Sequence, residues 1–396
     1  MLELATIRRP GLKAGNYDVG RILEALLYYR RVHLILDMQS FSGLAMTLGL
    51  KKLRMLLEHD DVTATFTGEF PAVNTTSSGT MKSHRAVFGK LLGNDPEDER
   101  PLKLAFNMLK DQSRFSSLKL RDLQPVIKLV SIASYDKMLG NQKQFDATFC
   151  SLATDTDTLR IALAMEAVLS EKSVNQSVIA DLNIESHNFD GEILIVSNIE
   201  PHALVGREPS FGWGNVLATL QDYAIDATVS QRQATDMIGS SEIKDLATRR
   251  IDLSLQRAHR SAEKIEGFQN VVFEGAGGLA DAYNTGTISF EDSLRLIDRS
   301  SKFREWLVGL SPDADILSEY HAAIAKDGIT SKLPVAATRF AFFTASGAGI
   351  DLLGGGGGLG TLAGVSLSAF DSFVIDKLLK GWRPNMFVET AKRSFT

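Results

Sequence analysis

The chain has 396 residues and a formal net charge of −5, with 44% hydrophobic and 23% charged residues. This composition is typical of a folded protein, and the length allows two or three domains with a substantial core. The negative charge excludes general nucleic-acid binding, because phosphate binding needs a concentrated positive surface.

Cys150 is the only cysteine, so the chain can form no intrachain disulfide and no cysteine-based zinc site. A reducing interior is its natural compartment. Near the N-terminus, Pro10-Gly11 stands where a signal peptide would need an apolar run. The sequence therefore predicts a cytoplasmic protein. Since the histidines show no paired metal-ligand spacing, we expect no metal and no cofactor.

The first hundred residues have the pattern of a small βαβ unit. The apolar run Val32–Leu36 predicts a strand, and the periodic leucines that follow predict a helix from about Gly43 to Glu58. Alternation over Val62–Thr67 predicts a second strand with one buried face. The segment Pro71–His84 is rich in Thr, Ser and Gly, and we expect a loop or an irregular hairpin there.

The middle of the chain mixes helical periods with one clear hairpin. Periodic apolar residues predict helices at Leu102–Leu109, Leu120–Met138 and Asp157–Leu169. Two alternating runs, Ile184–Phe189 and Glu192–Ser197, flank Asp190-Gly191. This dipeptide supplies the positive dihedrals of a type I′ turn, so it predicts a β-hairpin. A loop is expected from Pro201 to Gly214.

The C-terminal part is predicted to be helical. Apolar residues at spacings of three and four predict one long helix over Ile243–Ile265. A second helix is expected to open at Ser289, with Asp292 completing a capping box. We therefore predict an α+β fold in three regions: an α/β portion (1–100), a mixed helical and β-hairpin region (101–235), and a predominantly helical region (236–396).

An uncharged, glycine-rich apolar segment near the C-terminus is the most unusual feature of the sequence. Leu352–Phe370 contains five consecutive glycines, and Phe340–Ile350 precedes it with only Asp351 between them. So much small, apolar chain needs a special environment, such as a membrane, an oligomer seam or a tightly packed helix pair. A constitutive spanning helix is disfavoured, because each glycine costs about 1 kcal/mol relative to alanine in a helix.

Two interpretations of this segment stay open. One is a buried helical hairpin that turns at the glycines, and the other is a sheltered segment that contacts lipid or another subunit conditionally. Basic residues follow the segment directly, and cations beside an apolar element attract anionic head groups. The lipid interpretation predicts contacts by Phe340, Phe342, Phe343, Leu352, Leu353, Gly354, Gly356, Gly358, Leu359, Lys377, Lys380, Trp382 and Arg383.

A catalytic alternative centres on Asp37, at the end of a predicted strand. Strand ends are where an open α/β sheet carries catalytic carboxylates. His84 and Arg85 follow a polar segment and could complete a phosphoester-handling site. The simpler interpretation is that Asp37 caps the following helix and that His84 is a surface loop residue, and it makes an enzyme the less favoured class.

Nucleotide binding is also disfavoured. Val271–Gly278 resembles the entry to a phosphate loop, but neither it nor Gly354–Gly358 has the Lys-Ser/Thr of a Walker motif. A non-enzymatic oligomeric scaffold is a third class. The predicted helix Ile243–Ile265 carries an alanine-rich apolar stripe. This stripe and the glycine-rich segment both offer close-approach surfaces, so we expect a homo-oligomer and allow for a protein partner.

Several stretches in the second half resemble a set of uncharacterised bacterial proteins. The similarity covers mainly Ala224–Val388, and Leu26–Tyr29 also fits it; the stretches are Phe268–Val272, Ile288–Asp292, Phe303–Leu307, Glu319–Tyr320 and Ser368–Val388. The resemblance implies a component of an anti-phage defence system of the jumbo-phage-killing kind, such as a sensor or an effector. It carries no catalytic residue across, because none is assigned in that set.

Overall fold

The computed structural model of the chain describes residues 2–8, 12–13, 16–78, 81–90, 100–110, 115–117, 119–169, 182–204, 211–233, 235–238, 253–273, 278–311, 314–325 and 384–395. These residues divide into two compact units. The α/β unit takes its residues from Leu4–Ala25 and Arg31–Ser261. The helical unit takes its residues from Met1–Glu3, Leu26–Arg30 and Ala262–Thr396. The fold is α+β, as predicted, and every described strand lies in the α/β unit.

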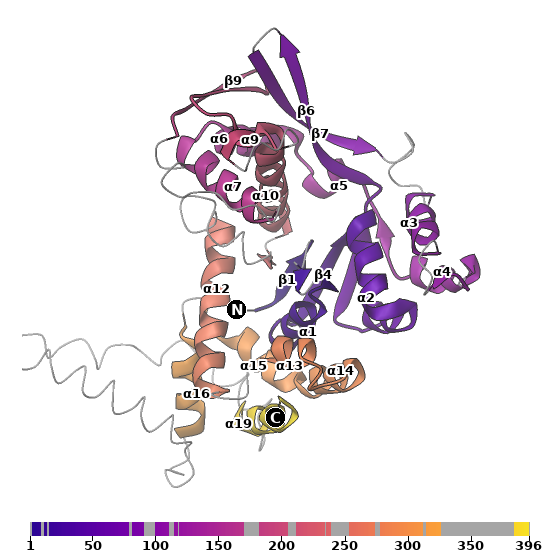
Figure 1. Ribbon diagram of the computed structural model, residues 1–396. Coiled ribbons are helices and arrows are strands. Elements are labelled where there is room, and N and C mark those ends of the chain that lie inside the picture. The colour runs from indigo at the N-terminus through magenta and orange to yellow at the C-terminus, as the bar shows by residue number, and fades with distance from the viewer. Residues whose placement is uncertain are drawn as a thin grey trace, which may run out of the picture. The chain divides into compact units, whose positions relative to one another are not determined.

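A five-stranded parallel sheet forms one half of the α/β unit (Figure 1). Its order is β11-β1-β4-β5-β8, with the strands β1 (Leu4–Ile7), β4 (Arg31–Leu36), β5 (Val62–Phe66), β8 (Ser131–Ile132) and β11 (Asp236–Met237). The chain adds β4, β5 and β8 on one side of β1 and later returns to add β11 on the other side. Open parallel sheets bind ligands outside the carboxyl ends of their strands at such a reversal of order.

The predicted strand–helix–strand unit is confirmed by β4, β5 and the helix between them, α2 (Met38–Leu57). α2 begins five residues before the expected Gly43. The cause is a capping box, in which Asp37 and Ser40 satisfy each other's backbone N–H groups at the first turn. Before it lie the short strands β2 (Leu12–Lys13) and β3 (Asn16–Tyr17) and helix α1 (Val19–Tyr28).

A four-stranded antiparallel sheet forms the other half of the α/β unit. Its order is β6-β7-β10-β9, with β6 (Glu69–Ser78), β7 (Met81–Lys90), β9 (Ile184–Phe189) and β10 (Glu192–Ser197). The hairpin predicted around Asp190-Gly191 is confirmed, since both residues have positive φ, 52° and 82°. Where a loop or irregular hairpin was expected over Pro71–His84, residues 71–78 and 81–84 belong to two regular antiparallel strands, and Gly79 and Thr80 lie outside the described residues.

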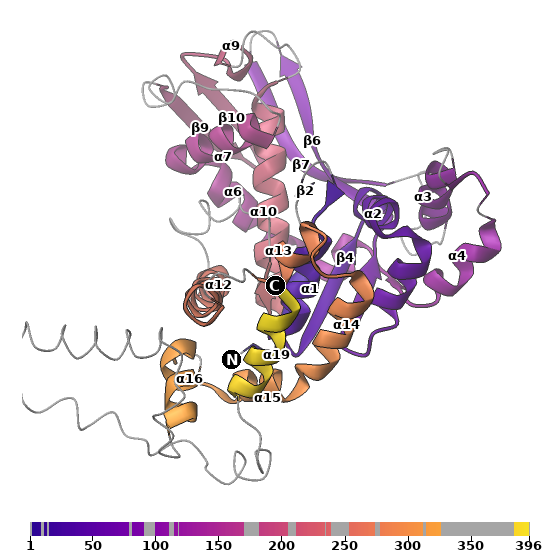
Figure 2. The same ribbon diagram turned by 60° about the horizontal axis from the view of Figure 1, so that its bottom comes forward.

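Helices cover one face of this antiparallel sheet in both views (Figures 1 and 2). They are α6 (Gln142–Ala153), α7 (Thr156–Leu169) and α10 (Trp213–Gln233). Their buried residues form one core with Ile193 and Ile195 of β10. The segment predicted as a loop over Pro201–Gly214 contains a short helix, α9 (Pro201–Leu204), and the first turn of α10.

Of the three helices predicted in this region, two are confirmed, as α3 (Arg100–Lys110) and α7. The expected helix Leu120–Met138 was wrong. It is divided into α4 (Leu120–Ile127), strand β8 and α5 (Tyr135–Leu139). Ser131 and Ile132 pair with β5, and the Ser131 hydroxyl lies 2.8 Å from Thr65 Oγ1. This long-range pairing overrides the helical period.

The helical unit is built around aromatic side chains. Its elements are the part of α12 (Leu253–Val272) from Ala262 onward, α13 (Leu279–Asn284), α14 (Phe290–Arg299), α15 (Ser301–Gly309), α16 (Ile316–Ala325) and α19 (Pro384–Phe395). Phe303 stacks on Phe387 with ring centroids 4.9 Å apart, and Phe268 meets Tyr320 edge-on at 5.3 Å. These contacts join α12, α15, α16 and α19 in one core.

Two predictions for this unit are settled in part. The Ser289 cap of α14 is confirmed, but the helix that it opens ends at Arg299, and Ser300 separates it from α15. The Ser300 hydroxyl donates to Ile297 O and closes the turn between the two helices. The predicted helix Ile243–Ile265 overlaps α12 from Leu253 onward, and its first ten residues lie outside the described part of the chain.

Candidate functional site at the carboxyl edge of the parallel sheet

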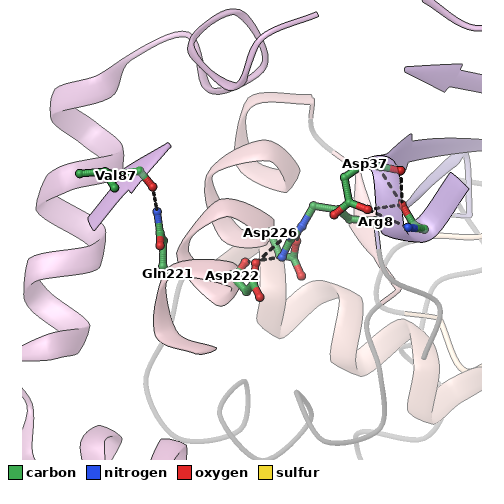
Figure 3. A network of polar contacts seen from close by, with 7 residues as sticks. Arg8, Asp37, Val87, Gln221, Asp222 and Asp226 are labelled. Atoms are coloured by element: carbon green, nitrogen blue, oxygen red, sulfur yellow. Dashed lines mark hydrogen bonds and ion pairs between the residues drawn. The ribbon is translucent and has the colours of Figure 1, made fainter. Parts of the chain in front are cut away.

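Arg8 follows β1 directly and is the centre of a buried ionic network (Figure 3). Its Nε donates to Asp226 Oδ1 at 2.5 Å, and its Nη1 donates to Asp222 Oδ1 at 2.8 Å. Its Nη2 also donates to the Asp222 backbone oxygen at 2.8 Å. Asp222 and Asp226 are four residues apart on α10, so they share one face of the helix. α10 is thus tied to the point where the strand order reverses.

The network keeps Arg8 charged although its side chain is only 2% exposed. Burial lowers the pKa of Arg8, but the attraction of Asp226 and Asp222 outweighs this and raises it well above the usual value. Two carboxylates facing one guanidinium leave no surplus positive charge for an anionic ligand. The chemistry of this trio is therefore that of a clamp between sheet and helix.

The residue before Asp222 points toward the other sheet. Gln221 Nε2 donates to the backbone oxygen of Val87 in β7 at 2.8 Å (Figure 3). Consecutive residues of α10 therefore bind both sheets of the α/β unit. Among the described residues, α10 is thus one element that holds the two sheets together.

Asp37 ends β4, the strand next to β1, and caps α2. Its Oδ1 accepts from the Ser40 backbone N–H at 2.7 Å and from the Ser40 hydroxyl at 2.8 Å. Arg8 and Asp37 end neighbouring parallel strands, since Ile7 pairs with Leu34. The capping role expected from the sequence is confirmed, and it uses this carboxylate in holding the helix.

Glu69 is a further acidic residue at this edge, and sequence reasoning missed it. It lies three residues beyond β5, is 3% exposed, and accepts from the Tyr135 backbone N–H at 2.5 Å. Burial raises the pKa of its carboxyl group, the N–H of Tyr135 opposes the shift, and Asp136 adds to it. A raised carboxyl pKa suits proton transfer. The available signal was a polar run, Thr67-Gly68-Glu69, directly after a strand.

His84 lies in the middle of β7 and is buried, so the expectation of a surface loop residue was wrong. Its Nδ1 lies 2.9 Å from the hydroxyl of Thr75, its cross-strand neighbour in β6. Its Nε2 is buried without a hydrogen-bond partner among the described residues. Burial, followed by the charge of Lys82, lowers the pKa of His84, while Glu200 raises it. The imidazole is therefore held neutral.

Arg85 is the next residue in β7, and it points to the opposite face of the sheet because side chains alternate along a strand. It is half-exposed, donates to the Asp190 backbone oxygen at 2.9 Å, and lies 3.8 Å from Glu192. Asp37 thus lies at the edge of the parallel sheet, and His84 and Arg85 lie on opposite faces of the antiparallel sheet. The structure does not group them as the phosphoester-handling alternative expected.

All thirteen residues predicted to contact lipid lie outside the described part of the chain. The described residues nearest to them form α19, where Phe387, Val388, Ala391 and Phe395 are buried. Across the described ranges, no helix has both the length and the apolar character needed to cross a membrane. The same ranges contain no group of three or more His, Cys, Asp or Glu side chains that could hold a metal ion.

Comparison of the chain with models of protein families, with curated proteins and with solved structures finds no match in any of the three.

Proposed function

We propose that this chain recognises a membrane surface through its C-terminal apolar segment, as a peripheral protein on the cytoplasmic side. The observation that supports this most is the packing of α16 against α19. α16 ends at Ala325 and α19 begins at Pro384, so the segment between them starts and ends at two helices that pack against each other. We call this helix pair the base of the segment. An apolar insertion with a fixed base suits reversible contact with a surface.

The base is well anchored within the helical unit. Phe387 stacks on Phe303, and Phe395 lies 5.5 Å from Phe273, measured between ring centroids. Tyr320 of α16 meets Trp306 of α15 at 6.4 Å. Aromatic pairs of this kind add about 0.5–1.5 kcal/mol each beyond the area that they bury. Both ends of the insertion are thus held by contacts that do not depend on lipid.

The chemistry of the insertion supports lipid as its partner. Phe340–Phe370 supplies apolar chain, and Lys377, Lys380 and Arg383 follow it with Trp382 among them. Each basic residue near an anionic surface adds about 1 kcal/mol, so the three together favour binding by roughly a hundredfold. Trp prefers the boundary between head groups and acyl chains.

Flotation of the full chain with vesicles tests the proposal. We expect wild type to float with vesicles of phosphatidylcholine and phosphatidylglycerol, and less with phosphatidylcholine alone. Changing Lys377, Lys380 and Arg383 together to Ser should weaken binding to the anionic vesicles by roughly a hundredfold. The matched control changes exposed Lys128, Lys143 and Arg299 to Ser and should bind as wild type does.

Two outcomes would refute membrane recognition. One is wild type that ignores both kinds of vesicle, and the other is a Lys377/Lys380/Arg383 variant that binds unchanged. The resemblance to the bacterial set supplies the biological setting that we propose, anti-phage defence as a sensor or an effector. There, cells expressing the same variant should lose protection against jumbo phages in a plaque assay while the control variant protects.

A further inference from the structure

α6, α7 and α10 bury one face of the antiparallel sheet, and the described residues on its other face, which we call the open face, include exposed apolar side chains. The described residues contain six large apolar side chains that are strongly exposed, and four of them lie on this open face. They are Phe70, Met81, Phe189 and Val196, with exposures of 42%, 57%, 63% and 52%. The inference rests on these described side chains and does not depend on membrane recognition.

The strand register shows that these side chains share one face. His84 pairs with Ile193, and both are buried on the helix-covered side. Residues one position away, Leu194 in β10 and Arg85 in β7, therefore point outward. The same alternation turns Met81 and Val196 outward, in register with each other across β7 and β10.

The side chains on a solvent-facing side of an antiparallel sheet are normally polar. On β10 the outward positions are instead Glu192, Leu194 and Val196, and on β9 they include Phe189, which pairs with Glu192. Met81, Val196, Leu194 and Phe189 follow one another across β7, β10 and β9, whereas Phe70 pairs with Gly89 toward the other end of β7. Contiguous exposed apolar side chains rimmed by polar ones mark an interaction site. The open face therefore has the character of an interface.

One pair of opposite charges on this face, Arg85 and Glu185, is placed symmetrically about Leu194. Leu194 pairs with Ser83 on one side and with His187 on the other. Arg85 lies on β7 next to Glu192, which is two residues before Leu194 on β10. Glu185 lies on β9, on the other side of β10, and pairs with Val196, two residues after Leu194. Arg85 and Glu185 are thus equally displaced from Leu194.

We propose that a second copy of this chain covers the open face. The two-fold axis lies in the interface over Leu194, at right angles to the line from Arg85 to Glu185. Such an axis exchanges the positions of Arg85 and Glu185, so Arg85 of each copy faces Glu185 of the other. The apolar residues around Leu194 then meet their own counterparts, as an isologous interface requires. The strands of the two sheets cross at a steep angle, which is the orthogonal class of sheet packing.

The same charges argue against the other occupants of such a face. Glu185, Asp190 and Glu192 lie on or beside it, and carboxylates disfavour contact with an anionic membrane. Binding of an unrelated protein would not require Arg85 and Glu185 to lie at equal distances from Leu194. Self-complementarity is the property that a second copy specifically requires.

Charge reversal tests the proposal on the full chain by sedimentation equilibrium. Wild type should have twice the mass of one chain at micromolar concentration. Arg85→Glu places two like-charged pairs at the interface, and so does Glu185→Arg, so each should weaken dimerisation by about a hundredfold. An equimolar mixture of the two variants restores both opposite-charge contacts and should form a heterodimer as strong as the wild-type dimer.

The mixture separates loss of the interface from loss of folding, because misfolded variants would not restore each other. Lys82→Glu reverses a charge on the same strand but on the other face, and it should remain a dimer. A monomeric wild type overturns the proposal. Dimeric single variants, or variants that stay monomeric when mixed, also overturn it and assign self-association, if present, to another surface.

Discussion

Arg8 Nε donates to Asp226 Oδ1 at 2.5 Å, and both side chains are almost completely buried. This contact joins the carboxyl end of β1 to the middle of α10. Because α10 also packs on β6 and β7, the pair fixes the helix that both sheets share. A charged contact, rather than an apolar one, thus stands at the centre of the α/β unit.

Replacing Arg8 by Met should destabilise the protein severely. The substitution keeps much of the volume but leaves Asp222 and Asp226 without their guanidinium. Breaking a buried ion pair from one side costs about 3–5 kcal/mol. Urea unfolding followed by circular dichroism measures this loss. Arg30→Met, at an exposed pair with Glu3, is the control and should cost less than about 1 kcal/mol; equal losses for the two variants would contradict the role of Arg8.

Gly43 is required by the ring of Tyr17. A Cβ atom at Gly43 would lie 1.9 Å from Tyr17 Cε2, so Gly43→Ala must displace the ring. We expect a loss of about 1–3 kcal/mol, the usual cost of overpacking. In the double variant with Tyr17→Ala the substitution at Gly43 should cost little, and urea unfolding of the four proteins gives the coupling directly. Additive losses would show that the ring does not constrain this position.

The titration of His84 should lower the stability of the protein as the pH drops below 6.5. The pKa of His84 is lowered from 6.5 in the folded state because of burial. Above pH 6.5 the side chain is neutral in both states. Below pH 6.5 His84 is protonated in the unfolded chain and stays neutral in the folded one. The free energy of unfolding therefore decreases as the pH falls from 6.5 toward the pKa of the folded state. Burial lowers the pKa of His33 too, which acts in the same direction.

Urea unfolding at several pH values between about 7.5 and 5 measures this dependence. This range includes the reference pKa of histidine. His84→Gln removes one of the titrating groups, so its stability should vary less with pH than that of wild type. An unchanged slope in His84→Gln would be evidence against the buried neutral imidazole.

Phe387 should hold α19 in the helical unit. Its ring is 4% exposed and stacks on Phe303, so Phe387→Ala removes a buried aromatic side chain. Such truncations cost about 3–5 kcal/mol. The neighbouring Met386 is 53% exposed, and Met386→Ala should cost less than about 0.5 kcal/mol. Thermal unfolding and limited proteolysis near the C-terminus compare the two variants; similar protection in both would remove α19 from the core.

Local signals in the sequence determined several elements of this fold. The β9–β10 hairpin follows from Asp190-Gly191, and the start of α14 follows from Ser289 and Asp292. The strands β4 and β5 follow from short apolar and alternating runs. In each case the deciding residues are within a few positions of one another, so the conformation is set by turn geometry, capping or side-chain period.

Only the tertiary structure decided the rest. β8 is strand instead of helix because Ser131 pairs with Thr65, which is 66 positions away. Arg8 gives no local sign that α10 will supply its two carboxylates more than 200 positions later. Equally, β7 places His84 inside and Arg85 outside only because one face of its sheet is covered by helices. The partners of charged side chains and the buried faces of strands depend on which helices and strands pack together. The local sequence around a residue does not specify this packing.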